Sequence, residues 1–250
     1  MRILDQDSFR AAPDVVLVDL DNTLYPYAPA HTAGLRAVEV KAIQLLGVGP
    51  DEFRAAFTLG REMVKATLGS VAASHSRLLY FQKALEELGL GSQVLLALDL
   101  EQTYWRAFLI EAELFPGARA FLDDLRLRGI PAVVVTDLTA QIQFRKLVAL
   151  EIDSYFDFVV TSEEVGVEKP DPRPFDLALD KVGFSGGLVW VIGDSGTRDV
   201  GVVAQRPDFV AIHKVREGAD GRSGTTAAAA NFSRFDALRR LLADLIGMAS

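Results

Sequence analysis

The chain has 250 residues, half of them apolar and 24% charged, a composition that allows a buried core and argues against a disordered chain. Its net charge of -8 gives no basic patch for nucleic acid or an anionic membrane, and the absence of cysteine excludes disulfides, thiolate catalysis and cysteine-ligated metals. The segment from Met1 to Pro13 lacks the apolar stretch of a signal peptide, and no apolar run approaches the ~20 residues that span a bilayer. We therefore expect a cytoplasmic protein without nucleic-acid or membrane partners, monomeric or homodimeric.

Five short apolar runs predict the strands of a sheet. Each is rich in β-branched residues and bounded by turn residues. Continuous apolarity, rather than alternation, is typical of a strand that is covered on both faces. The runs are Val15–Val18, Pro131–Val135, Phe158–Val160, Leu188–Ile192 and Phe209–Ile212.

Helical patterns separate the later runs, and one more pattern closes the chain. Strands that alternate with helices predict an α/β fold, a Rossmann-like parallel sheet with helices on both faces. A small, polar, alanine-rich segment, Gly218–Ala230, is expected to be a surface loop. The predicted helices are Ala118–Arg128, Thr139–Leu150, Arg173–Val182, Thr197–Gln205 and Ser233–Ile246, with Ser233 as N-cap of the last.

The interval from Pro29 to Glu113 breaks the alternation. It shows helical periodicity, punctuated by glycine-containing turns, and no convincing strand. Because this interval is too long for a βα crossover, we predict an inserted all-helical subdomain over residues 29–112. Residues 1–28 and 113–250 then form the α/β core.

The first predicted strand runs into Asp19 and Asp21, spaced by two residues. The carboxyl end of a parallel strand is where open α/β sheets bind ligands. Two like charges ~4 Å apart repel by about 4 kcal/mol at an effective dielectric near 20, so a divalent metal or a shared proton would have to offset them. The Asp-Asn-Thr sequence is also typical of a simple turn, so this pair alone leaves both interpretations open.

A second strand ends in the same way, at Gly193-Asp194, with Asp199 five residues later. Magnesium prefers oxygen ligands, and Asp19 and Asp194 at two strand ends are candidates to supply them. Asp199 by itself fits an ordinary acid in the first turn of a helix. The Gly-Asp-Ser-Gly sequence also occurs in trypsin-like proteases, but those are disulfide-bonded β-barrels and this chain has an α/β pattern without cysteine.

Two further residues have the chemistry to bind a phosphate. Thr136 ends the strand Pro131–Val135, where a hydroxyl and the following backbone N–H groups can donate to phosphate oxygens. Lys169 stands between turns and can pair with a phosphate and with a carboxylate. Each also has an ordinary explanation, a β-branched strand end and a solvated surface lysine.

Taken in order, these motifs closely resemble those of the haloacid dehalogenase-like hydrolase superfamily. The resemblance covers Val15 to Asp199 and includes Phe115-Pro116-Gly117 before the next helix. The helical insert resembles the C1-type cap of the phosphatase and dehalogenase branches. The Asp-Leu-Asp-Asn-Thr-Leu-Tyr-Pro stretch is similar to that of pyrimidine 5'-nucleotidase-like members.

The resemblance implies a Mg²⁺-dependent phosphatase with an aspartyl-phosphate intermediate, acting on a nucleoside monophosphate or sugar phosphate. It implies Asp19 as nucleophile and Asp21 as general acid and base. Thr136, Asp137 and Lys169 would bind the substrate. The metal would be held by Asp19, the backbone carbonyl of Asp21, Asp194 and Asp199.

Asp137 departs from the family pattern, which often has asparagine there. Its carboxylate would repel a phosphate dianion unless it turns away or pairs with Arg145 or a cationic substrate group. Substrate contacts from the cap are expected among a set of polar and aromatic residues: Tyr25, Tyr27, His31, His75, Arg77 and Tyr104.

Three alternatives stay open. A phosphomutase would keep both acids, Asp19 and Asp21. A 2-haloacid dehalogenase needs no acid at Asp21 for its leaving group and resembles this chain less there. A catalytically silent binding module is disfavoured by the presence of all four motifs.

Overall fold

The computed structural model describes residues 1–202, 206, 208–218 and 228–247. The chain divides into two compact units. Unit 1 contains Met1–Pro26, Glu113–Asp137 and Glu151–Ser250, and unit 2 contains Tyr27–Ala112 and Leu138–Leu150. No helix in the described part of the chain combines the length and apolarity needed to cross a bilayer.

Unit 1 is built on a seven-stranded sheet in the order β1-β7-β6-β5-β2-β3-β4. The pairs from β7 to β4 are parallel, and β1 alone pairs antiparallel, with β7. The central strands β2, β3 and β5 are buried at every position. The strands are β1 Arg2–Ile3, β2 Val15–Val18, β3 Ala132–Thr136, β4 Phe158–Thr161, β5 Val189–Gly193, β6 Phe209–Lys214 and β7 Ala230–Phe232.

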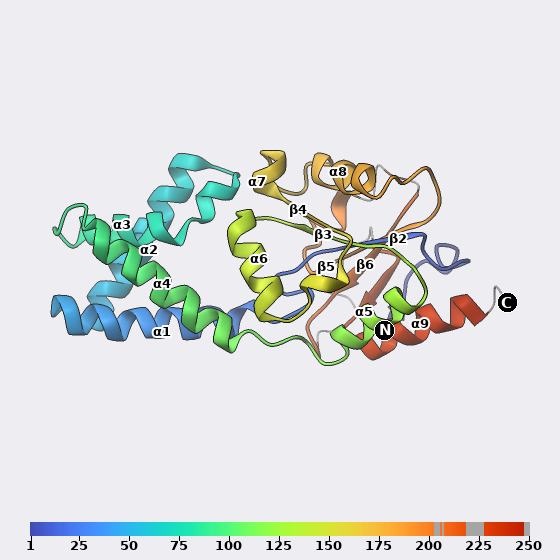
Figure 1. Cartoon of the computed structure of the whole chain (residues 1–250), viewed down its shortest axis with the longest axis horizontal. Helices are drawn as coiled ribbons and strands as arrows, with labels where there is room; N and C mark the ends of the chain where they lie inside the picture. Colours follow the sequence, from blue (N-terminus) through green and yellow to red (C-terminus); the bar gives the residue numbers. More distant parts are fainter. Residues whose placement is uncertain (203–205, 207, 219–227, 248–250) are drawn as a thin grey trace. The chain divides into compact units, whose positions relative to one another are not determined.

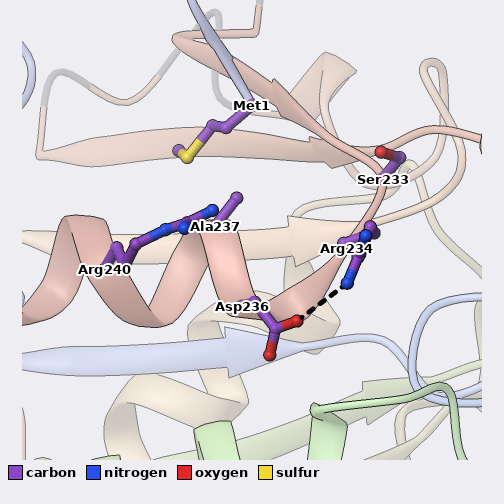
Figure 2. Close-up of a pocket in the computed structure, with 6 residues that line it drawn as sticks. All are labelled: Met1, Ser233, Arg234, Asp236, Ala237 and Arg240. Atoms are coloured by element: carbon purple, nitrogen blue, oxygen red, sulfur yellow. Dashed lines mark hydrogen bonds and ion pairs between the residues drawn. The ribbon is translucent and has the colours of Figure 1, made fainter.

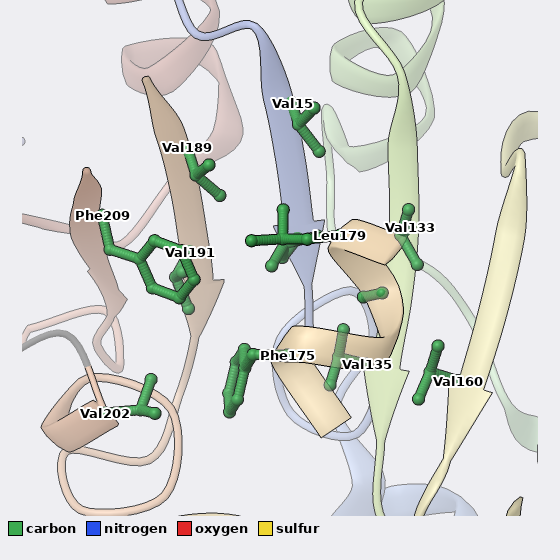
Figure 3. Packing of buried hydrophobic residues seen from close by; sticks show 12 residues of the cluster. Val15, Val133, Val135, Val160, Phe175, Leu179, Val189, Val191, Val202 and Phe209 are labelled. Carbon is green, nitrogen blue, oxygen red and sulfur yellow. The ribbon is translucent and has the colours of Figure 1, made fainter. Parts of the chain in front are cut away.

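Helices cover both faces of this sheet (Figure 1). On one face, Phe175 and Leu179 of α8 (Arg173–Lys181) pack on the valines of the central strands, as Figure 3 shows. On the other face lie α5 (Ala118–Leu127) and α9 (Phe235–Gly247), joined by the contact of Phe121 with Phe235. Successive strand residues point to opposite faces, so a strand covered on both sides must be apolar throughout. The shorter helical segments are η2 Asp153–Tyr155 and α7 Ser162–Val165.

Unit 2 is helical in all of its described secondary structure. Its helices pack closely at two glycines: a Cβ at Gly34 would lie 2.8 Å from the Tyr104 ring, and a Cβ at Gly60 2.8 Å from the Tyr80 carbonyl oxygen. Close approach of helix backbones therefore requires glycine at both positions. The elements are α1 Tyr27–Leu46, α2 Pro50–Leu68, η1 Ala72–His75, α3 Arg77–Glu87, α4 Val94–Glu111 and α6 Ala140–Ala149.

The predicted α/β class and the mostly parallel sheet are confirmed, and all five predicted strands are present. The edge strand β1 and its neighbour β7 were not predicted, because two or three residues are too few to show a pattern. The helix α6, predicted as part of the core, clusters with unit 2. The predicted loop Gly218–Ala230 lies mostly outside the described residues, and its last residue opens β7.

The predicted α-helix Thr197–Gln205 is wrong in its described part, where only residues 201 and 202 are helical and these have the 3₁₀ conformation. Residues 196–199 form a turn, and residues 203–205 lie outside the described residues. Side chains occupy the backbone donors here: the Asp199 carboxylate accepts the Ser195 N–H, and the Ser195 hydroxyl accepts the Arg198 N–H. The backbone keeps one helix-like bond, from the Asp199 N–H to the Ser195 carbonyl at 3.0 Å, but residues 197–200 do not continue as an α-helix.

Candidate active site

The carboxyl ends of three adjacent parallel strands bring the predicted site residues together. Strand β2 lies between β5 and β3, with Val18 opposite both Ile192 and Val134. The residues that follow these strands therefore leave the same edge of the sheet. Asp19 follows β2 directly, Asp194 follows β5, and Thr136 ends β3.

Lys169 is the centre of the resulting hydrogen-bond network. Its ammonium donates to Asp19 Oδ1 at 2.7 Å, to Asp199 Oδ1 at 2.6 Å and to the Val135 carbonyl at 2.9 Å. All three ammonium protons are therefore used. The side chain is only 3% exposed, so Lys169 is a buried cation bridging two carboxylates and not a solvated surface lysine.

The second oxygen of Asp19 is held as well. Thr23 Oγ1 donates to Asp19 Oδ2 at 2.8 Å, and Thr23 is fully buried. The carboxylate of Asp19 is thus fixed by one donor on each oxygen. Sequence reasoning did not assign Thr23 a role, although it stands four residues after Asp19 in the same motif.

The titration of these groups reflects their crowding. Burial raises the pKa of Asp19 to about 7, with Asp199 and Asp194 adding to the rise and Lys169 opposing it. Burial and Asp199 also raise the pKa of Asp194. For Lys169, burial would lower the pKa, but Asp19 and Asp199 raise it, so the lysine stays charged. Ionised carboxylates here need more positive charge than Lys169 alone supplies.

The donor set fits a hard divalent cation. Asp19, Asp194 and Asp199 can each offer one oxygen, with all three ligand atoms within 4.8 Å of one another. Such carboxylate oxygens are the ligands that Mg²⁺ prefers, usually with water and substrate oxygens completing the shell. A cation there would also offset the repulsion that raises the pKa of Asp19 and Asp194.

Glycine at position 193 makes room for Asp199. A Cβ on Gly193 would lie 2.3 Å from Asp199 Cγ, a separation that real Cβ atoms do not show.

His213 of β6 holds the residue after Gly193. Its Nε2 lies 2.9 Å from the Asp194 carbonyl oxygen and must carry the proton to donate. Sequence reasoning missed His213, which lies opposite Gly193 in the β5–β6 register.

This arrangement coincides with a family match. The model of the haloacid dehalogenase-like hydrolases matches residues 13–205, which is more than half of the chain and contains every residue of the network. The chain belongs to the haloacid dehalogenase-like hydrolases.

Relatives of this hydrolase are known by sequence and by fold. A ribulose-1,5-bisphosphate 5-phosphatase from Halopiger xanaduensis is 42% identical over 188 residues, covering 74% of this chain and 78% of the relative. A HAD phosphatase from Thermococcus onnurineus shares the fold with a TM-score of 0.68 and 24% identity, over 91% of this chain and 97% of that one. A 2-haloacid dehalogenase from Pseudomonas syringae pv. Tomato has a TM-score of 0.71 and 22% identity, over 92% and 98%.

Asp137, the departure from the family pattern, has partners in this hydrolase. Its Oδ1 accepts the Lys169 backbone N–H at 3.1 Å, and its Oδ2 lies 3.3 Å from Arg198 Nη1. The expected options for pairing were Arg145 or a substrate cation, whereas the structure shows an ion pair with Arg198. Burial raises the pKa of Asp137, and Lys169 and Arg198 oppose the rise.

Asp21 is not one of the three carboxylates of the cluster, although its charge contributes to the raised pKa of Asp194. Its side chain accepts a hydrogen bond from the hydroxyl of Tyr25, which is fully buried. Tyr25, predicted as a cap candidate, therefore belongs to unit 1 and orients Asp21. Thr136 is also buried, and its hydroxyl lies 3.3 Å from the Asp137 carbonyl oxygen.

A second polar cluster lies within unit 2, among four of the other cap candidates. Arg77 donates to the His75 carbonyl at 2.7 Å and to the hydroxyl of Tyr27. His31 Nδ1 lies 2.6 Å from the hydroxyl of Tyr104, which is fully buried. Lys146 lies beside these residues, with its ammonium 5.6 Å from the ring centroid of Tyr27. We call Tyr27, His31, Arg77, Tyr104 and Lys146 the Arg77 cluster.

The stability of the protein should fall with acidification because of His31. Burial, with Arg77 and Arg61, lowers the pKa of His31 to about 4, below the usual 6.5. Between about pH 6.5 and pH 4, His31 therefore binds a proton in the unfolded chain but not in the folded protein. This difference favours unfolding as the pH falls through that range. Such a shift corresponds to at most about 3 kcal/mol, and solvent screening of the partly exposed ring reduces the expected loss to about 1–2 kcal/mol.

Urea denaturation of the protein and of His31→Gln at pH 7 and pH 4.5 would test this. Glutamine keeps polar atoms near Tyr104 but does not titrate. Between pH 7 and pH 4.5 the free energy of unfolding should therefore fall more for the wild type than for His31→Gln. An unchanged difference would show that His31 titrates normally.

A surface pocket of unit 1 contains none of the site residues. About 260 Å³ in volume, it is lined by Met1, Ser233, Arg234, Asp236, Ala237 and Arg240 (Figure 2). Its one acid, Asp236, is paired with Arg234 at 3.2 Å. The candidate active site therefore rests on the buried network around Lys169 and not on this pocket.

Proposed function

We propose that the protein is a Mg²⁺-dependent phosphatase that hydrolyses a small phosphorylated metabolite through an aspartyl-phosphate on Asp19. Family membership and the phosphatase at 42% identity support the reaction class. The roles of the site residues and the assignment of residues 29–112 as a cap are part of this proposal.

One observation carries the proposal. Asp19 is a buried carboxylate fixed on both oxygens, by Lys169 at 2.7 Å and by Thr23 at 2.8 Å, with Asp194 and Asp199 within metal-ligating reach. A carboxylate nucleophile needs this kind of orientation, because an attack in line with the leaving group tolerates little misplacement. Lys169 together with a divalent cation bound by the three carboxylates would offset the negative charge of an approaching phosphate.

In the first step, an Asp19 oxygen attacks phosphorus and the ester bond to the leaving oxygen breaks. Asp21, oriented by Tyr25, gives its proton to the leaving alkoxide. Lys169 neutralises Asp19 and the phosphoryl oxygens, and Thr136 binds the phosphoryl group. Mg²⁺, held by Asp19, Asp194 and the Asp21 carbonyl and supported by Asp199, would neutralise charge on the transferring group.

In the second step, the aspartyl-phosphate is hydrolysed. Asp21, now ionised, takes a proton from water, and the resulting hydroxide attacks phosphorus and releases Asp19. The proton returns Asp21 to its starting state. A dehalogenase has no alkoxide to protonate, so the acid at Asp21 favours the phosphatase over that alternative.

The substrate of the relative at 42% identity favours a sugar phosphate. Ribulose 1,5-bisphosphate is a phosphorylated pentose, so we place this class first and nucleoside monophosphates second. The ion pair of Asp137 with Arg198 neutralises the carboxylate that would otherwise repel the substrate.

A phosphate-release screen over sugar phosphates, nucleoside monophosphates and phosphorylated hydroxy acids tests the proposal. Release should require Mg²⁺, and excess EDTA should abolish it. A parallel screen for halide release from 2-haloacids tests the dehalogenase alternative. No phosphate release from any class, or release that persists in EDTA, would contradict the proposal.

Magnesium should also stabilise the protein without substrate. At about 100 times its dissociation constant, a ligand of the folded state adds about 2.7 kcal/mol, which corresponds to about 5–10 °C in Tm for a chain of this size. Asp194→Asn should remove most of this increase in a thermal denaturation experiment. Asp244→Asn, an exposed acid on α9, should keep it. Equal increases in both variants would place the ion elsewhere.

A further inference from the structure

Two buried side chains in the sheet of unit 1 carry polar atoms that have no hydrogen-bond partner among the described residues. They belong to His213 of β6, which is 7% exposed, and Asn231 of β7, which is 3% exposed. The atoms concerned are Nδ1 of His213 and both Nδ2 and Oδ1 of Asn231. Burying a polar atom without a partner is costly, so the retention of both side chains requires an explanation.

The register of the sheet places these two residues side by side. His213 is paired with Asn231 across the parallel strands β6 and β7. Paired residues of adjacent parallel strands point to the same face of the sheet. Because adjacent strands lie about 4.8 Å apart, the distance is within the combined reach of an amide and an imidazole. The Asn231 amide can therefore approach the His213 ring by rotation of its side chain alone.

The hydrogen bond at the other ring nitrogen determines the role of His213 Nδ1. A carbonyl oxygen can only accept, so Nε2, which lies 2.9 Å from the Asp194 carbonyl oxygen, carries the proton. In the neutral ring Nδ1 is then an acceptor, whereas Nδ2 of Asn231 is a donor. An N–H···N bond between these two atoms would hold the imidazole in the orientation that points Nε2 at Asp194.

His213 contacts a peptide group that belongs to the candidate metal site. The peptide between Asp194 and Ser195 is held at both of its polar atoms. Its carbonyl oxygen accepts from His213 Nε2, and its N–H donates to Asp199 Oδ2 at 3.0 Å. Asp194 and Asp199 are two of the three carboxylates whose ligand atoms lie within 4.8 Å of one another. A rotation of this peptide would therefore displace both carboxylates.

We propose that Asn231 is a positioning residue of the candidate active site: its amide donates to His213 Nδ1 and so fixes the ring that holds the Asp194–Ser195 peptide. Loss of a residue that orients a metal ligand typically lowers metal affinity about 10- to 100-fold. Asn231 acts through a second residue, so we expect the lower end of this range. The inference rests on the proposed phosphatase function for the role of the metal, and it adds to the site a residue two strands away from β5.

A matched pair of variants tests the donor. Asn231→Thr keeps a hydroxyl that can donate to Nδ1, and Asn231→Val has the same shape without a donor; both residues suit a strand. The NMR chemical shift of an unprotonated imidazole nitrogen changes when that nitrogen accepts a hydrogen bond. The chain has three histidines, and His213→Gln identifies the signals of His213. At alkaline pH and without metal, Nδ1 should show the bonded shift in the wild type and in Asn231→Thr but not in Asn231→Val.

Two further measurements follow the effect to the metal site. Hydrogen exchange of the Ser195 amide reports its bond to Asp199, and exchange should be faster in Asn231→Val than in Asn231→Thr or the wild type. Calorimetric titration with Mg²⁺ alone should give an affinity about 10-fold lower for Asn231→Val and within about twofold of wild type for Asn231→Thr. If Asn231→Val gives no cooperative thermal transition, Asn231→Leu, whose size is closer to that of asparagine, replaces it.

The outcomes separate this inference from the proposed function. A wild-type Nδ1 shift in Asn231→Val, or equal changes in Asn231→Val and Asn231→Thr, overturns the inference, because the amide is then not needed as a donor. Unchanged Ser195 exchange and Mg²⁺ affinity in a variant whose Nδ1 shift has changed also overturn it. A wild type that releases no phosphate rejects the phosphatase proposal and leaves these measurements valid, because none of them requires turnover. If the wild type binds no Mg²⁺, the proposed metal site is rejected, and the Nδ1 shift and Ser195 exchange decide whether Asn231 positions the peptide.

Discussion

Replacing Asp19 with asparagine should lower phosphate release by about 10⁴-fold or more, since the variant keeps the shape of the side chain but loses the nucleophile. The remaining rate would come from Asp21 activating water directly. The measurement is steady-state phosphate release with Mg²⁺ at saturating substrate. The wild type, quenched in acid during turnover, should yield a phosphorylated peptide that contains Asp19, and the variant should not.

Asp244→Asn provides the matched control, because it makes the same chemical change at an exposed position of α9. It should retain wild-type activity. Substantial turnover by Asp19→Asn would show that another group is the nucleophile. The network that fixes both oxygens of Asp19 would then not serve nucleophilic attack.

Replacing Lys169 with methionine should damage stability and activity together. The substitution leaves Asp19 and Asp199 buried without the cation that joins them at 2.7 and 2.6 Å. Breaking one side of a buried ion pair costs about 3–5 kcal/mol, and loss of a positioned charge at the reacting group should lower kcat by about 10²–10³-fold. Urea denaturation without metal and phosphate release with Mg²⁺ measure the two effects.

A second substitution distinguishes charge from packing. Lys169→Met combined with Asp199→Asn removes one of the stranded carboxylates, so part of the lost stability should return while activity stays low. Lys181→Met, at the partly exposed pair with Glu164, should change stability by about 1 kcal/mol or less. If the double variant is no more stable than Lys169→Met, charge imbalance is not the cause of the loss.

The central sheet could be predicted because burial on both faces imposes continuous apolarity on each strand. Val15–Val18 shows this most clearly, since the predicted and observed bounds agree. The edge strand β1 lacks that constraint, since both of its residues are exposed, and β7 is buried but has only three residues, too few to show a pattern. Residues 197–199, predicted as the start of a helix, form a turn in which the Asp199 and Ser195 side chains accept backbone N–H groups, and sequence periodicity does not reveal such bonds.

The location of the candidate site could be predicted because parallel strands end at one edge of the sheet. From this arrangement the sequence predicted that Asp19, Asp194 and Asp199 lie close together. The structure places their ligand atoms within 4.8 Å of one another. Their roles stay predictions. Pairing between distant side chains could not be predicted: Asp137 finds Arg198, 61 residues away, where Arg145 was the expected partner on the protein.

The side chains of residues 193 and 199 would occupy the same space. The carboxylate of Asp199 stands where the first side-chain atom of residue 193 would be. Substitutions at the two positions are therefore not independent: alanine at 193 should be rejected while aspartate occupies 199 and better tolerated beside a smaller residue there. The residue tolerated at position 193 thus depends on the size of the side chain six residues later. A pairwise mutational scan would detect this dependence as epistasis between positions 193 and 199.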